Sequence, residues 1–194
     1  MRIAEIRKEV EDLAPNILKR LGFDKVGSLG EFIKTQASGD KHAVLIDVVK
    51  DSSSFSISVR VFAFYKLIED LFKNVSSHNK YTINIYLAAK SIRFDDFSRN
   101  NVEEILNHLI TTEALPFLEQ YSTAESVFKN LNSSNYQEWI TSDKVSQFKI
   151  KMASAVSSKN AEELENIKTK ALDYCAKPWS GSNREIIKEL CKSI

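Results

Sequence analysis

Residues 42–64 read HAVLIDVVKDSSSFSISVRVFAF, and this stretch decides the fold. In its second half, residues 54–64, apolar side chains alternate with serines and one arginine, Arg60. Such alternation is typical of a β-strand with one face on the core and one in solvent. The first half, residues 42–50, is apolar on both faces, which is typical of a central strand. The short serine-rich link between the halves favours antiparallel pairing.

The flanking sequence extends this hairpin in both directions. Residues 31–36 and 81–89 also read as strands, whereas residues 65–75 change to helical spacing. Upstream, apolar residues recur every three or four positions from residue 3 to 21, which predicts an amphipathic helix. We expect Pro15 to bend or restart that helix. Gly22 and Phe23 follow its end and fit a left-handed C-cap with an apolar residue folding back.

From about residue 99 the spacing is helical to the end of the sequence. Two helices are predicted to begin with capping boxes, Ser122 to Glu125 and Ser182 to Glu185. The fold class is therefore α+β: an N-terminal helix and a mixed or antiparallel four-stranded sheet, followed by a C-terminal all-helical segment. We expect residues 1–131 to form the α+β domain and residues 132–194 a helical extension packed on it as one globular unit.

The charge balance limits the partners. Lys and Arg total 27 against 26 Asp and Glu, so no net field draws the protein to nucleic acid or to an acidic membrane. A basic helical face of Lys144, Lys149 and Lys151 around Phe148 is the alternative, but Asp143 beside it favours a solvated surface. The N-terminus mixes acids and bases where a signal peptide is apolar, and no long apolar run follows. These features predict a cytoplasmic protein with no nucleic-acid or membrane partner.

Residues 21–30, LGFDKVGSLG, have the glycine spacing of a phosphate-binding loop. That motif needs a lysine where this chain has Ser28, and it follows a strand and opens a helix. Here the order is reversed, because a predicted helix precedes the loop and a strand follows it. We therefore expect no nucleotide cofactor.

Reactive side chains are few and dispersed. The three histidines, His42, His78 and His108, lie on different predicted elements, and no paired-ligand spacing accompanies them. Cys175 and Cys191 have apolar helical spacing and are interpreted as buried free thiols in a reducing compartment. The sequence thus predicts no metal site, no cofactor and no catalytic set. The adjacent acids Asp95 and Asp96 are typical of a turn that leads into a helix.

Five residues are the candidates for ligand or partner binding. Arg60, Phe62, Asn84 and Tyr86 would share the solvated sheet face, where an arginine among aromatic rings and an amide suits a carboxylate, a peptide or a base. The alternative is an ordinary polar sheet face, with Phe62 covered by the C-terminal helices. Trp179 lies in the loop KPWSGSN and either anchors a partner or fills the gap between the two helices that the loop joins. We favour the second role, because large aromatic side chains dominate packing.

One family resemblance is carried by residues of the N-terminal part. The chain resembles a widespread bacterial domain family of unknown function at Leu21, Gly22, Phe23, Lys25, Phe32, Lys50 and Ser52, and again over residues 113–131. It departs from the family pattern at Val49, where a glutamine is expected. The resemblance covers roughly residues 1–131 and implies the fold and a bacterial cytoplasmic setting, but no catalytic residues.

The predicted function follows from this resemblance and from the missing catalytic set. We expect a non-enzymatic protein-interaction domain, of the immunity or accessory type that small bacterial domains of this sort often represent. The alternative is a small-ligand-binding protein or an enzyme that uses a pocket on the sheet face, with Arg60, Asn84 and Asp95 or Asp96 as its polar groups. The oligomeric state is not predicted.

Overall fold

The computed structural model describes residues 3–26, 31–75, 83–131 and 143–194. The chain divides into two compact units. The first, called the sheet unit, comprises Met1–Ala37, Lys41–Ala63 and Asn84–Gln120, and the second, called the helical unit, comprises Ser38–Asp40, Phe64–Ile83 and Tyr121–Ile194. These bounds differ from the division expected at residue 131, because the helical unit begins its last stretch at Tyr121 and also takes in a hairpin turn and the segment from Phe64. The expected packing of residues 132–194 as part of one globular unit stays a prediction.

Five antiparallel strands form one sheet in the order of the chain. They are β1 (Asp24–Val26), β2 (Glu31–Thr35), β3 (Lys41–Lys50), β4 (Ser54–Phe64) and β5 (Ile83–Arg93). The register pairs Lys25 with Phe32 and Phe32 with Val44. The α+β class and the four predicted strands are confirmed. The fifth strand, β1, was not predicted because its three exposed residues are too few to show alternation.

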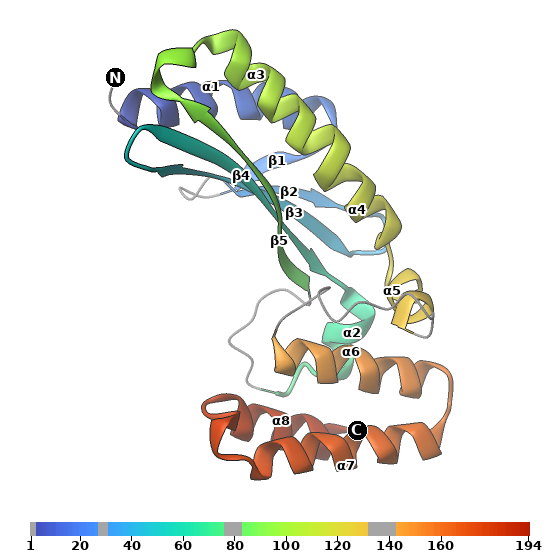
Figure 1. The fold of residues 1–194 in the computed structure, drawn as a ribbon. Coiled ribbons are helices and arrows are strands. Elements are labelled where there is room, and N and C mark those ends of the chain that lie inside the picture. Colours follow the sequence, from blue (N-terminus) through green and yellow to red (C-terminus); the bar gives the residue numbers. More distant parts are fainter. Residues whose placement is uncertain (1–2, 27–30, 76–82, 132–142) are drawn as a thin grey trace. The chain divides into compact units, whose positions relative to one another are not determined.

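Helices cover one face of this sheet, as Figure 1 shows. They are α1 (Ile3–Arg20), α3 (Arg99–His108) and α4 (Leu115–Gln120). Phe55, Ile57, Val59 and Val61 of β4 are fully buried, as the alternation predicts. The other side of β4 is less exposed than expected, because Ser58 and Phe62 are buried and Arg60 is half-buried. β4 lies between β3 and β5 in the sheet, so its side chains have neighbours on both sides.

The end of α1 confirms the predicted C-cap. Gly22 has a φ of +82°, and its N–H donates to the Lys19 carbonyl at 3.1 Å. The Phe23 N–H donates to the Leu18 carbonyl at 3.0 Å, and Phe23 is buried. These are the two bonds of a Schellman motif, so Gly22 ends helix α1. Gly27 and Ser28, the other phosphate-loop positions, lie outside the described residues.

Proline affects two helices differently. α1 runs through Pro15 as one helix, so of the two expected outcomes the restart does not occur. Between α3 and α4 the chain forms a π-helical segment, Leu109–Ala114, just before Pro116. Pro116 has no N–H, and its ring would collide with a carbonyl one turn earlier in a regular helix. A wider turn before the proline relieves that collision.

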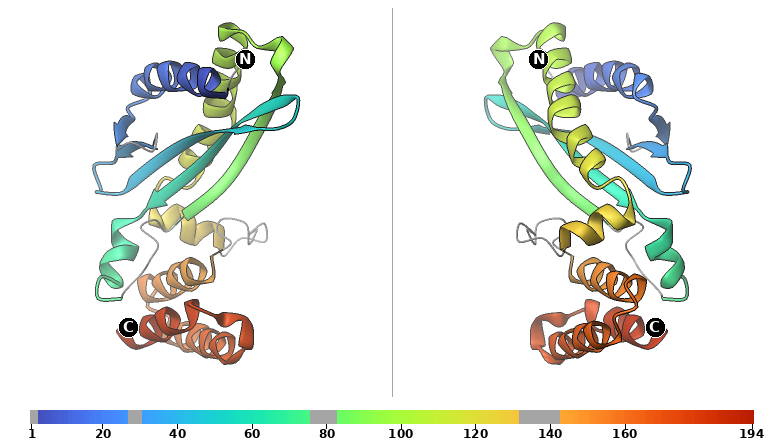
Figure 2. Two further views of the ribbon diagram at one scale, coloured as in Figure 1. Left: turned by 90° about the vertical axis from the view of Figure 1, so that its left-hand side faces the viewer. Right: turned by 90° about the vertical axis from the view of Figure 1, so that its right-hand side faces the viewer.

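Among the described residues, the helical unit contains five α-helices, which two further views display (Figure 2). They are α2 (Lys66–Leu71), α5 (Ala124–Leu131), α6 (Lys144–Ser157), α7 (Ala161–Ala176) and α8 (Asn183–Ser193). α6, α7 and α8 pack against one another, and α2 and α5 both pack on α6. α6 therefore forms the centre of this unit.

Both predicted capping boxes are wrong in detail. At α5 the reciprocal bonds join Thr123 and Ser126, each at 3.2 Å, because the short Ser126 hydroxyl reaches the Thr123 N–H. This leaves Glu125 outside the cap. At α8, Ser182 makes no side-chain cap bond, because its own backbone is already helical (φ −64°, ψ −19°) where a cap residue is normally extended.

Candidate binding groove

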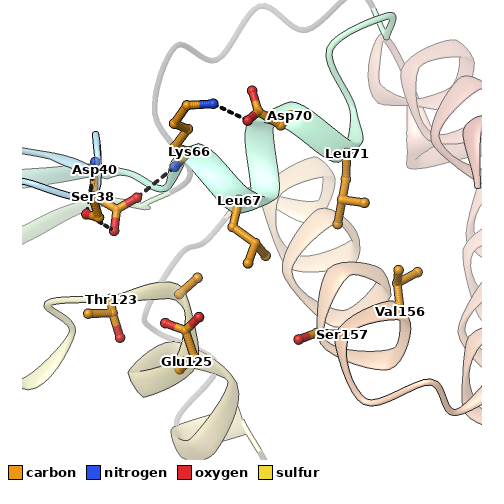
Figure 3. A pocket seen from close by; sticks show the side chains of 11 residues that line it. Ser38, Asp40, Lys66, Leu67, Asp70, Leu71, Thr123, Glu125, Val156 and Ser157 are labelled. Carbon is orange, nitrogen blue, oxygen red and sulfur yellow. Dashed lines mark hydrogen bonds and ion pairs between the residues drawn. The ribbon is translucent and has the colours of Figure 1, made fainter.

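A groove of about 680 Å³ lies within the helical unit, between α2, α5 and the last turn of α6 (Figure 3). We call it the α2–α5–α6 groove. Its lining residues are Ser38, Asp40, Lys66, Leu67, Asp70, Leu71, Thr123, Ala124, Glu125, Val156 and Ser157. All of them belong to the helical unit. They come from the β2–β3 turn, from the three helices, and from Thr123 directly before α5. This volume is typical of ligand-binding sites in proteins.

The walls of the groove are apolar. Leu67 and Leu71 lie one turn apart on α2 and flank Ile68, which is fully buried in the core. Leu67 is 40% exposed, and Figure 3 shows it pointing into the groove. Val156 faces Leu71 across the groove from α6 (Figure 3). Covering an exposed leucine and its two aliphatic neighbours with a partner removes apolar surface from water, which favours binding.

Asp40 builds one end of the groove by capping α2 from a distant turn. Its Oδ1 accepts from the Lys66 backbone N–H at 2.8 Å, and its Oδ2 accepts from the Ser38 hydroxyl at 2.9 Å. Tyr65, which occupies the cap position of α2, makes no side-chain hydrogen bond to the N-terminus of that helix. Gly39 makes this turn possible, because it has a φ of +89° and a Cβ there would lie 3.0 Å from Cδ of Lys66.

The rim of the groove carries more acids than bases. The charged residues that line the groove are three carboxylates, the buried Asp40 and the exposed Asp70 and Glu125, and one ammonium, Lys66. Lys66 is ion-paired with Asp70, four residues along α2, and both side chains are more than half exposed. Glu125 is exposed and has no hydrogen bond or ion pair with another described residue. The rim is therefore net negative, and Glu125 is its carboxylate without a partner in the described part of the chain.

A buried ion pair joins α2 to α6. Lys149 Nζ lies 2.6 Å from Glu69 Oε2, and the Lys149 side chain is only 4% exposed. Lys144, at the start of the same helix, donates to Gln147 at 2.7 Å. The basic face considered for nucleic acid thus loses its middle lysine, because Lys149 points into the unit and not into solvent.

Tyr65 ties the start of α2 to the segment before α5. Its side chain is fully buried, and its hydroxyl donates to the Tyr121 carbonyl at 2.5 Å. Burial, with smaller contributions from Asp40 and Tyr121, raises the pKa of Tyr65 far above its usual value of 10. The phenol therefore stays protonated and remains a donor across the physiological range.

None of the five sequence-predicted binding residues lines this groove. Arg60 and Phe62 lie on the same side of β4 in the sheet unit, two residues apart. Asn84 and Tyr86 belong to β5 by their backbone, and their side chains lie outside the described residues. A grouping of these four side chains therefore stays a prediction.

Trp179 lies in the helical unit and is 69% exposed, so the expectation that it fills a gap between helices is wrong. It stands in a short 3₁₀ turn, Pro178–Ser180, between α7 and α8, with Lys177 Nζ 5.5 Å from its ring centre. Ser180 takes the inward position, because it is 1% exposed and donates to the Lys177 carbonyl at 2.9 Å. The Ser180 side chain is therefore hydrogen-bonded within the turn, and the Trp179 ring lies in solvent.

The remaining reactive side chains are not among those that line the groove. His42 is buried, with Nδ1 3.3 Å from Gln36 Nε2, and His108 lies 4.0 Å from Glu113. His78 is outside the described residues. In the ranges that the structure describes, no three His, Cys, Asp or Glu side chains are grouped so as to hold a metal ion. Asp95 and Asp96 form an exposed 3₁₀ turn before α3, as predicted.

Both cysteines are free thiols, as predicted. Cys175 is buried, and Cys191 is only half-buried. Desolvation raises the pKa of each thiol, so neither is activated as a nucleophile near neutral pH.

Among the helices of the described ranges, none combines the length and the apolar character that crossing a bilayer requires.

Sequence reasoning missed the groove because its residues are spread along the chain. Asp40 and Lys66 are 26 residues apart, and Glu125 and Val156 lie further along still. The available signals were local: the turn sequence Ser38-Gly39-Asp40 and an apolar residue, Leu67, one position before the core residue Ile68. Neither signal shows that the two segments meet.

Comparison with protein-family models, with curated proteins and with solved structures gives no match for this chain. The resemblance of residues 1–131 to a bacterial domain family therefore stays a prediction.

Proposed function

We propose that this protein is a non-enzymatic protein-interaction domain and that it binds its partner in the α2–α5–α6 groove. The observation that carries the proposal is the anatomy of the groove. Its centre is aliphatic, with Leu67 exposed, and its rim is polar and charged. An apolar centre within a polar rim is the usual arrangement of a protein–protein interface.

The side chains of the groove support binding more than chemistry. Its described lining includes no histidine or cysteine, and its hydroxyl groups are those of Ser38, Thr123 and Ser157. Ser38 donates to Asp40, which is itself engaged by the first N–H of α2. A nucleophilic hydroxyl needs a base that is free to take its proton, and Asp40 serves here as a helix cap.

The family resemblance supports the setting of this function. It favours a bacterial cytoplasmic protein of the immunity or accessory type, which acts by occupying a surface of another protein. The alternative, a small-ligand-binding protein or an enzyme with a pocket on the sheet face, would draw on Arg60. The groove described above contains neither Arg60 nor any other residue of the sheet unit.

Affinity capture with two matched surface variants tests the proposal. Leu67→Asp places a charge on the groove wall, and Leu172→Asp makes the same change on α7, at a leucine that is 49% exposed and outside the groove. We expect wild type and Leu172→Asp to retain the same partner from host extract and Leu67→Asp to lose it. Equal retention by all three, or loss only with Leu172→Asp, would contradict the proposal.

A further inference from the structure

We infer that the segment received by the α2–α5–α6 groove carries an apolar side chain flanked by arginine or lysine. This inference rests on the proposed function and adds the chemistry of the partner. It is drawn from the charge balance of the rim and from the position of Leu67 between the charged groups.

The apolar requirement comes from the groove walls. Leu67, Leu71 and Val156 face a common space (Figure 3), and a partner gains most by filling that space with a leucine-sized side chain. In protein interfaces, a central apolar anchor of this kind supplies much of the affinity.

The basic requirement comes from the carboxylates that stand around this space. Lys66 is neutralised by Asp70, so it does not offset the other acids. Asp40 is held by Ser38 and by the Lys66 N–H, which satisfies its hydrogen bonds but brings no positive charge. Glu125 lies exposed across from Leu67, without a partner among the described residues.

Arginine fits this rim particularly well, because its planar guanidinium bonds a carboxylate through two parallel N–H groups. The pair with Glu125 would be exposed at the edge of the groove. Exposed pairs add little affinity, but they select among partners and accelerate encounter at low salt. The apolar anchor therefore sets the strength of binding, and the rim sets which segments bind.

The charge also argues against an acidic occupant. A segment with acidic residues beside its anchor would face net like charge at the rim. A second copy of this chain could fill the groove only with a basic apolar segment of its own. Sedimentation of wild type and of Leu67→Asp tests for that self-association.

The test uses the full-length protein and three sets of fluorescent 12-residue peptides. Each peptide carries one leucine in a varied context, flanked by arginine and lysine in the first set, by glycine and serine in the second, and by glutamate and aspartate in the third. Binding is followed by fluorescence anisotropy at low and at physiological salt. The variants are Leu67→Asp, Glu125→Lys and, as a matched control, Glu162→Lys, an exposed acid in the first turn of α7.

We expect the basic set to bind about tenfold more tightly than the acidic set. Glu125→Lys should remove or reverse this preference, Leu67→Asp should abolish binding of every set, and Glu162→Lys should change nothing. The preference should shrink as salt rises. Circular dichroism and thermal unfolding of each variant establish that a loss of binding is not a loss of fold.

Several results would overturn the inference: no binding of any set, binding that is indifferent to flanking charge, or a preference that survives Glu125→Lys. Dodecylamine is added as a further probe; if it binds as tightly as the basic peptides, the groove is assigned to a small cationic amphiphile instead. Self-association lost in Leu67→Asp, seen by sedimentation, would assign it to a second copy. If a captured partner depends on Leu67 but docks through an acidic or neutral segment, the proposed function stands and only this inference fails.

Discussion

At the scale of single residues, the groove depends on groups whose roles are set by partners far along the chain. Asp40 caps a helix that begins 26 residues later, and Tyr65 bonds a carbonyl 56 residues away. Sequence analysis identified the local capping at Gly22 correctly, because all of its bonds lie within a few residues. It could not identify these distant partners, because no local pattern records them.

Removing the Asp40 cap should destabilise the helical unit. In Asp40→Ala the first N–H of α2 and the Ser38 hydroxyl lose their acceptor, and we expect the free energy of unfolding to fall by about 1–2 kcal/mol. Asp40→Asn keeps an oxygen for the Lys66 N–H and should lose less than half as much. Urea denaturation followed by circular dichroism measures both variants. Equal losses would show that Asp40 does not act as a cap.

The buried phenol of Tyr65 should make stability fall at high pH. In the unfolded chain Tyr65 loses its proton above about pH 10, whereas burial keeps it protonated in the fold. The folded state then binds more protons, so the free energy of unfolding falls as pH rises above 10, by up to about 1.4 kcal/mol per pH unit.

Tyr65→Phe isolates this effect from that of other tyrosines and of the two thiols. At pH 7 the variant should be less stable by about 1–2 kcal/mol, because the Tyr121 carbonyl loses its donor. The difference should narrow as pH rises above 10. A difference that stays constant to pH 12 in urea titrations would contradict the assignment of the raised pKa to Tyr65.

At the scale of helices and strands, α2 is the least self-sufficient element of the groove. It has six residues, too few to be stable alone, and it is held by the Asp40 cap, by Ile68 in the core and by Glu69 on Lys149. The sequence predicted a helix here from its spacing. It did not predict that the helix packs on α6, because Lys149 reads as a surface residue in a charged stretch.

The Glu69–Lys149 pair should respond asymmetrically to substitution. Glu69→Ala leaves the Lys149 ammonium buried without its carboxylate, which costs about 3–5 kcal/mol. Lys149→Met replaces the ammonium by an apolar side chain in an apolar place, and the more exposed Glu69 can turn to water. We expect this variant to lose at least about 1 kcal/mol less, as measured by urea denaturation. A larger loss for Lys149→Met would show that the pair is not buried as described.

β5 is an outer strand of the sheet, and its charges should keep it from pairing with other chains. It is eleven residues long, and Lys90 and Arg93 on it are exposed. Charged side chains on edge strands oppose edge-to-edge association. The double variant Lys90→Val, Arg93→Val should therefore self-associate in a concentration-dependent manner in sedimentation velocity experiments.

Lys19→Val, a change at an exposed lysine on α1, is the control for added surface hydrophobicity and should sediment like wild type. If the control and the double variant associate equally, the effect comes from general hydrophobicity and not from the strand edge.

At the scale of the whole molecule, the chain passes between its two units more than once. The β2–β3 turn and the segment from Phe64 belong to the helical unit, although the strands around them belong to the sheet unit. Periodicity predicted the elements well, because each depends on its own residues. The unit boundaries depend on contacts between segments distant in sequence. A single boundary at residue 131 cannot describe them, because each unit is made of three separate stretches of the chain.

The same reason explains why the candidate site was sought elsewhere. The alternation of residues along β4 predicted a site at Arg60 and Phe62, because the pattern lies within one strand and can be read from the sequence. The groove instead combines Asp40, Leu67, Glu125 and Val156, four residues that share no motif. Only the folded chain brings them to one surface of the helical unit.

The central claim is that this groove binds a protein partner, and its most direct test is an affinity measurement. The captured partner is titrated against wild type, Leu67→Asp and Leu172→Asp by isothermal titration calorimetry. We predict that Leu67→Asp weakens binding by at least about tenfold and that Leu172→Asp leaves it within about twofold of wild type. Wild-type affinity in Leu67→Asp, or an equal loss in both variants, would contradict the claim.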